Sequence, residues 1–226
     1  MQFKIEGSVF PMLEIQLSRG ESVFTESGGM AWMSQGINMS TNTRGGLMAG
    51  LGRALAGESL FMVNYTCEGN SGRVVFTPEA PGRVLNMTLE ANQSLICQKD
   101  AFLCGEDSVE MKMYFQKRLG AGIFGGEGFI LQKVTGPGEV FLAIPGEVKE
   151  YTLSQGDRIL VDPGHIAFFE PSVSYDISMV KGIKNVIFAG EGLFLATLTG
   201  PGKIWLQTMP LSNLAAKLSR YLHLKS

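Results

Sequence analysis

The chain has 226 residues, and 45% of them are hydrophobic, which is enough apolar material for a substantial core. Only 18% are charged and the formal net charge at pH 7 is −2, so no basic field is present that would gather nucleic acid by charge alone. The sequence has no uninterrupted run of 18 apolar residues and no signal-peptide pattern, and we therefore expect a soluble, cytoplasmic protein.

A recurring pattern organises the sequence from its N-terminal part onward. The stretch 17–33 returns in outline at 89–103 and 153–169, with Gly20, Asn92 and Gly156 at one shared turn. The comparison also aligns Met30–Met33 with Asp100–Leu103 and Ile166–Phe169. Self-similarity of this kind indicates repeated structural units. We expect three units, at about 1–76, 77–142 and 143–208, within one β body over 1–208.

Short apolar stretches fill these units. Examples that are rich in β-branched or aromatic residues and bounded by Gly, Pro, Asn or Asp are 74–76, 84–89, 129–134, 140–144 and 204–207. Such short stretches, several of them alternating with period two, are typical of strands. The predicted fold class is all-β, with three tandem, pseudo-symmetric repeats about a pseudo-threefold axis.

The C-terminal segment 209–226 has a different period. Ser212 can cap a helix, and the apolar residues that follow at helical spacing are Leu214, Ala215, Leu218, Tyr221 and Leu222. We expect a C-terminal α-helix that packs against the β body or against a neighbouring subunit.

Two apolar segments diluted with glycine are candidate interfaces. The first contains Leu47, Met48, Leu51 and Leu55, and a weaker counterpart contains Ile123 and Phe124. Such segments can line a subunit interface, pack in the core, or dock on a membrane surface or a foreign protein. We favour the subunit interface and keep the other two interpretations open.

Three glutamates hold corresponding places in the three units. They are Glu58, Glu127 and Glu191, each preceded by glycine. If the units surround an axis, the carboxylates could converge and bind a cation. Alternatively, each carboxylate accepts hydrogen bonds from neighbouring turn amides, which explains the triplication equally well. We favour the structural role.

The remaining motifs do not indicate catalysis or a cofactor. Residues 120–125 match the GxGxxG pattern, but a strand follows them where a phosphate-binding loop requires a helix. His165 stands at a turn and is interpreted as a turn residue rather than a general base. Cys67, Cys97 and Cys104 form no CxxC pair and are expected to be buried thiols, and no cluster has the ligands of a zinc site. We expect no catalytic residues, no cofactor and no metal.

The glycine-rich segments bring a family resemblance. Arg44-Gly-Gly-Leu-Met-Ala-Gly, Gly57-Glu-Ser-Leu-Phe-Met, Gly125-Gly-Glu-Gly-Phe and Gly190-Glu-Gly-Leu together resemble the AIM24 family, named for altered inheritance of mitochondria. The resemblance implies a duplicated β fold, similar to the tryptophan RNA-binding attenuation protein and to a short double-stranded β-helix, with association into rings or trimers. It implies no reaction and no catalytic residues.

These observations favour a non-enzymatic, oligomeric β scaffold or interaction protein that forms a trimer or a larger homo-oligomer. The alternatives are a binding protein for a small molecule, lipid or RNA and, further off, an enzyme with an unrecognised site. Nucleic acid is an unlikely partner because the nearest approach to a stacking surface, around Tyr114 and Phe115, has few cations. A protein or a membrane surface stays open as a partner.

Overall fold

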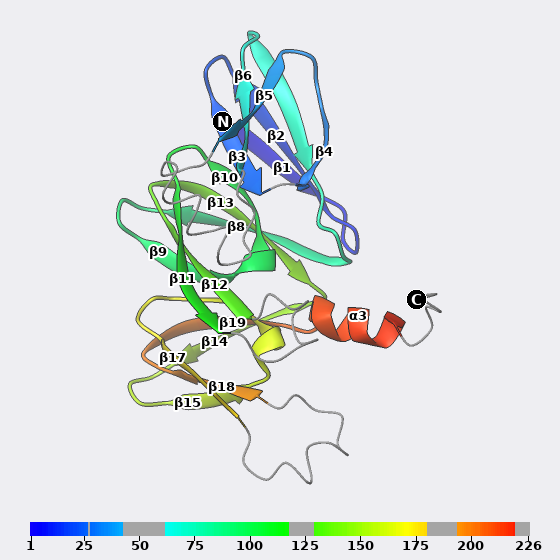
Figure 1. Cartoon of the computed structure of the whole chain (residues 1–226). Helices are drawn as coiled ribbons and strands as arrows, with labels where there is room; N and C mark the ends of the chain where they lie inside the picture. The colour runs from blue at the N-terminus through cyan, green and yellow to red at the C-terminus, as the bar shows by residue number, and fades with distance from the viewer. Residues whose placement is uncertain (27, 43–61, 118–128, 180–193, 220–226) are drawn as a thin grey trace.

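The computed structural model describes residues 1–26, 28–42, 62–117, 129–179 and 194–219, which form antiparallel strands in four sheets and one α-helix (Figure 1). The fold class predicted from the sequence, all-β with a C-terminal helix, is confirmed. The helix α3 spans Leu211–Ser219. It begins one residue before Ser212, the residue predicted to cap it, and the backbone N–H groups of Asn213 and Leu214 donate to the carbonyl of Pro210 instead.

The four sheets draw their strands from overlapping parts of the chain. The first, in spatial order, contains β1 (Gln2–Glu6), β2 (Met12–Ser18), β7 (Ser71–Phe76) and β4 (Met30–Met33). The second contains β5 (Ile37–Asn42), β6 (Met62–Cys67), β3 (Ser22–Glu26), β10 (Phe102–Glu106), β13 (Gly138–Pro145) and β8 (Gly82–Leu89).

The third sheet contains β11 (Glu110–Lys117), β12 (Phe129–Thr135), β9 (Ser94–Gln98), β16 (Ile166–Phe169), β19 (Gly202–Gln207) and β14 (Val148–Leu153). The fourth contains β15 (Arg158–Val161), β18 (Phe194–Thr199) and β17 (Ser174–Met179). Short 3₁₀ turns, η1 (Lys99–Ala101) and η3 (Pro163–His165), precede β10 and β16.

Two strand arrangements recur through these sheets. The run β2-β7-β4 returns as β8-β13-β10 and as β14-β19-β16, while β3-β6-β5 returns as β9-β12-β11 and as β15-β18-β17. A register shift falls at the same place in the pairs β4–β7, β10–β13 and β16–β19. The exact unit boundaries proposed from the sequence stay a prediction, but these local correspondences assign equivalent positions.

The sequence alignment of the repeats is wrong by two residues in the middle copy. Phe102, and not Asp100, is the counterpart of Met30. Met30 pairs with Phe76, and Phe102 pairs with Leu142, which holds the place of Phe76 in the middle copy. Asp100 lies in η1, before the strand begins. A shift of two residues keeps every side chain on the same face of a strand, so the apolar pattern alone cannot reveal it.

Three apolar cores fill the spaces between successive sheets. The first core lies between the first and second sheets and contains Phe76 and Phe141. The central core lies between the second and third sheets and contains Phe24 and Phe168. The last core lies between the third and fourth sheets and contains Phe129 and Phe169. The two inner sheets are therefore covered on both faces, which explains the continuous apolar run of β13. The first and fourth sheets form the ends of the stack (Figure 1).

Candidate functional site

The residues that the sequence singled out most strongly lie outside the described residues. This holds for the proposed interface residues Leu47, Met48, Leu51, Leu55, Ile123 and Phe124, for the glutamates Glu58, Glu127 and Glu191, and for the glycine-rich loop 120–125. In the sequence, these segments lie between β5 and β6, β11 and β12, and β17 and β18. Their proposed roles stay predictions.

His165 is part of a local turn. It is the last residue of η3, where the carboxylate of Asp162 accepts a hydrogen bond from the backbone N–H of Gly164 at 3.0 Å. The His165 ring Nδ1 lies 2.7 Å from the carbonyl oxygen of Gln207 in β19. The imidazole therefore ties the turn to the neighbouring strand, as the interpretation of His165 as a turn residue requires.

The three cysteines are free and buried, as the sequence predicted. Burial raises the pKa of the Cys97 thiol to about 12, and the negative charge of Glu26 raises it further in the same direction. Burial also raises the pKa of the Cys104 thiol well above its ordinary value. Because the thiolate is the nucleophile, both residues act as packing groups in the folded protein.

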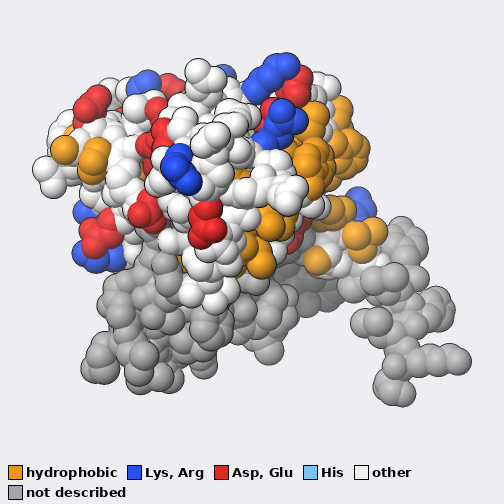
Figure 2. All heavy atoms as spheres, turned by 90° about the horizontal axis from the view of Figure 1, so that it is seen from above, with side chains coloured by type: hydrophobic (Ala, Val, Ile, Leu, Met, Phe, Trp, Pro, Cys, Tyr) orange, Lys and Arg blue, Asp and Glu red, His pale blue; other side chains and the backbone are white. Residues whose placement is uncertain are grey.

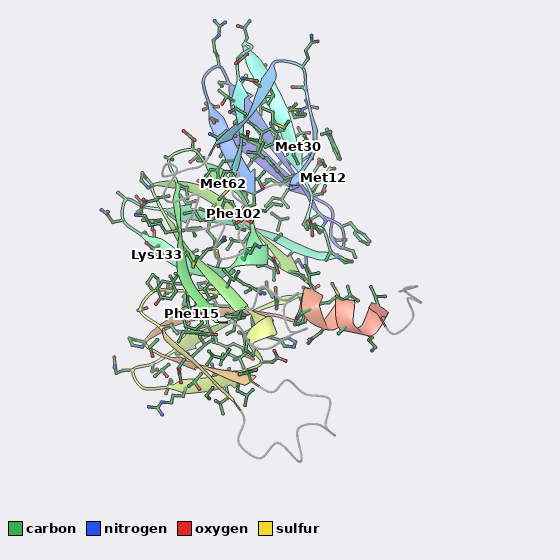
Figure 3. The ribbon with its side chains drawn as sticks, in the orientation of Figure 1. Met12, Met30, Met62, Phe102, Phe115 and Lys133 are labelled. Carbon is green, nitrogen blue, oxygen red and sulfur yellow. The ribbon has the colours of Figure 1, made fainter. Side chains whose placement is uncertain are left out.

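A cavity with polar and apolar walls lies between η1 and the strands β3, β10 and β13 of the second sheet. Its volume is about 270 Å³, and charged residues in its wall are Glu26, Glu79, Lys99 and Asp100. Thr25 in the wall donates its hydroxyl to the carbonyl of Leu103 at 2.5 Å, and Phe102, seen in Figure 3 beside Met62, closes the apolar side. Glu26 accepts a hydrogen bond from the side-chain amide of Gln132 at 2.7 Å.

The corresponding place in the next pair of sheets is filled by a side chain. Ala143 in the cavity wall is equivalent to Gln207, because the neighbouring residues Leu142 and Leu206 pair with Phe102 and Ile166. The Gln207 amide donates to Gln98 Oε1 at 3.1 Å and to the carbonyl of Gly164 at 2.7 Å. The alanine of the middle unit thus leaves space at a place where the last unit has a buried glutamine.

The chemistry of the cavity is that of a hydrogen-bond acceptor site. Glu26 takes the place of Gln98, and Asp100 takes the place of Gly164, so two carboxylates replace an amide and a glycine. Carboxylates accept hydrogen bonds, and the Gln207 amide shows that a nitrogen donor fits the equivalent space. With Glu79 the wall, as far as the described residues form it, carries three carboxylates against the single cation Lys99, and this excess of acceptors suits a small group that donates hydrogen bonds.

The second candidate site is a set of exposed apolar side chains. Among the described residues, large exposed hydrophobic side chains include Val9, Phe10, Trp32, Met33 and Leu160. In the view along the stack, hydrophobic side chains gather along one side of the molecule (Figure 2). Met12 and Met30, at the ends of β2 and β4, lie on that side of the first sheet (Figure 3). The sequence pattern did not single out β4 or β15, because their residues are apolar like those of buried strands.

Comparison with known proteins places the chain in a family. The sequence profile described as "Mitochondrial biogenesis AIM24" matches residues 3–209. The chain belongs to the AIM24 family. An uncharacterised protein of Streptococcus pyogenes serotype M6 is 31% identical over 231 residues, which cover 98% of this chain and 91% of that protein. The resemblance drawn from the glycine-rich segments is therefore confirmed.

A crystal structure of a Streptococcus pyogenes protein has the same fold as this AIM24 chain. Its TM-score is 0.79 at 28% sequence identity, and the match covers 98% of this chain and 99% of the other. Within the described ranges, no helix is long and apolar enough to cross a membrane. No group of three or more His, Cys, Asp or Glu side chains among the described residues is placed to hold a metal ion.

Proposed function

We propose that this AIM24 protein is a non-enzymatic scaffold that acts as a homo-oligomer of three or more chains. The observation that supports the proposal is the apolar surface at the first sheet, where Trp32 is 52% and Met33 is 37% exposed. Soluble monomers seldom leave large apolar patches in contact with water, because covering them by association is favourable. Neighbouring chains are the partners always available to cover such a surface.

The mass of the protein in solution tests this proposal. Size-exclusion chromatography with light scattering, at micromolar concentration, is expected to give the mass of a trimer or a larger assembly. Dilution should shift the mass downward, because association obeys mass action. A mass of one chain at all concentrations would contradict the proposal.

A second candidate function is the binding of a small polar molecule in the cavity beside Ala143. The carboxylates of Glu26 and Asp100 in the wall favour a ligand that carries an amide or an ammonium group. The volume of about 270 Å³ is slightly below the usual range of ligand pockets, roughly 300–1,000 Å³. The scaffold therefore remains the first proposal.

A further inference from the structure

The two inner sheets show how consecutive units join. In the second sheet β10 pairs with β3, with Gly105 opposite Phe24, and in the third sheet β16 pairs with β9, with Phe169 opposite Ile96. The two junctions use equivalent residues, because Gly105 and Phe169 face the equivalent residues Val140 and Ile204 on their other side. Each inner sheet is thus built from strands of two successive units.

Each end sheet contains one of the two strands that pair with each other at an inner junction. In the described sheets, β4 is an edge strand of the first sheet, although its counterparts β10 and β16 each pair with a second strand. Similarly, β15 is an edge strand of the fourth sheet, although its counterparts β3 and β9 each pair with a second strand. The stack therefore ends in two complementary halves.

The exposed side chains follow the same division. Leu160 in β15 is 66% exposed, whereas its counterparts Phe24 and Ile96 are fully buried. Trp32 in β4 is 52% exposed, whereas its counterparts Cys104 and Phe168 are fully buried. Leu160 and Trp32 are thus exposed at the two ends, at places where the inner junctions bury their counterparts, whereas Val161 is already buried within the single chain.

We propose that β15 of one chain pairs antiparallel with β4 of a second copy and forms a third junction. This inference rests on the proposed homo-oligomer and specifies its interface. The register of the inner junctions places Leu160 opposite Met33 and Val161 opposite Trp32. The two halves then make one sheet in the order β17-β18-β15-β4-β7-β2-β1, which matches β5-β6-β3-β10-β13-β8 and adds β1.

The occupant is a second copy because one chain cannot join its own ends as it is folded here. The first and fourth sheets lie at opposite ends of the stack, with two sheets between them (Figure 1). Packed sheets are about 10 Å apart, so the end sheets are separated by about 30 Å. Paired strands need a separation of about 5 Å. A neighbouring chain, with its first sheet on the fourth sheet of the other, meets this requirement.

The composition of the two strands also fits a pairing of identical chains. Soluble proteins protect permanent edge strands with charges or proline. The edge strand β14 carries Lys149 and Glu150, and the edge strand β11 carries Glu110 and Lys112. The strand β4 has no charged residue and β15 has only Arg158, so their pairing brings no like charges together, although the edge strands β5 and β8 are equally poor in charge.

Engineered cysteines test the pairing and its register. A chain with Met33→Cys is mixed with a chain that has Leu160→Cys, then oxidised and separated without reductant. A disulfide-linked dimer is expected from the mixture, and single chains from either variant alone. The pair Trp32→Cys and Val161→Cys is used in parallel, because adjacent antiparallel pairs alternate in Cα separation. The natural cysteines are buried and do not interfere. Phe10→Cys, at another exposed apolar residue, replaces Leu160→Cys in the control mixture and should give no dimer.

The outcomes separate this inference from the scaffold proposal. If light scattering shows an assembly of three or more chains but neither cysteine pair links, the scaffold stands and the β4–β15 interface is wrong. A wild-type monomer with no link would overturn both. A double variant, Met33→Cys with Leu160→Cys, that links only within one chain would also overturn the pairing between copies. Leu160→Lys should dissociate the assembly to single chains, and an unchanged far-ultraviolet circular dichroism spectrum with a cooperative melting transition establishes that this variant is folded.

Discussion

Single residues fix the recurrent turn of this fold. Gly20, Asn92 and Gly156 have φ values of +84°, +66° and +83°, a left-handed conformation that glycine and asparagine tolerate best. In each turn, a side chain one residue later binds the backbone N–H at its start: Glu21 binds Ser18, Gln93 binds Glu90 and Asp157 binds Ser154, at 2.7, 2.9 and 2.9 Å. The conformation is conserved between the turns although these side chains differ.

Asn92, which holds the same place in the turn of the middle unit, predicts the effect of a substitution at Gly156. No atom lies within 4 Å of a Cβ added there, so a side chain pays only for the backbone conformation. We expect Gly156→Ala to lower the free energy of unfolding by about 1 kcal/mol, and Gly156→Asn, which copies Asn92, to lower it by less. Urea unfolding of the three proteins measures the difference. Equal losses for alanine and asparagine would contradict the argument.

At the same scale, the sequence allowed the turns to be predicted but not the interface. The shared place of Gly20, Asn92 and Gly156 was visible because a left-handed turn restricts the residue type. In contrast, Trp32 and Leu160 are apolar like their buried counterparts, and the sequence pattern is therefore the same at an inner and at an end strand. Exposure distinguishes them only once the order of strands in the sheets is known.

Elements differ in how far the sequence defines them. The strand β13 is a continuous apolar run because both faces of its sheet are covered, and burial alternates along β2 because only one face of its sheet is covered. Both patterns predict strands directly. The start of α3 was predicted less well, because the Pro210 carbonyl and not the Ser212 hydroxyl accepts the first N–H groups. The cavity was not predicted, since Ala143 is typical of a buried strand.

The two junctions between units predict the effect of filling the cavity. Ala143→Gln places an amide where Gln207 stands in the next unit. The Glu26 carboxylate and the Asp100 backbone carbonyl hold the places of the two acceptors of Gln207, Gln98 Oε1 and the Gly164 carbonyl. We expect the free energy of unfolding to rise by about 0.5–1.5 kcal/mol through hydrogen bonding. Ala143→Leu fills similar space without donors and should not stabilise the protein. Thermal and urea unfolding compare the variants, and a gain from leucine equal to that from glutamine would show that volume alone matters.

At the scale of the whole molecule, the arrangement of ends decides how chains associate. Pairing of β15 with β4 is head-to-tail, so each added chain presents a new β15 edge to the next. Contacts of this type form a closed ring if the rotation between neighbours closes, and a filament if it does not. The size of the assembly is therefore set by the angle between two chains, while its existence depends on the two edges.

Head-to-tail growth predicts that a chain blocked at one end terminates assemblies. A Leu160→Lys chain has a free β4 edge but a β15 that cannot pair, because its lysine would be buried at a place where Phe24 and Ile96 are fully buried. Added to wild type in equal amount, it should lower the mass of the assemblies themselves, measured by light scattering after size-exclusion chromatography has separated them from single chains. A chain blocked at both ends, Trp32→Lys with Leu160→Lys, is the matched control and should leave the wild-type assemblies at their original mass. If the doubly blocked chain lowers the mass to the same extent, β4 does not receive the wild-type β15 edge, and association uses another surface.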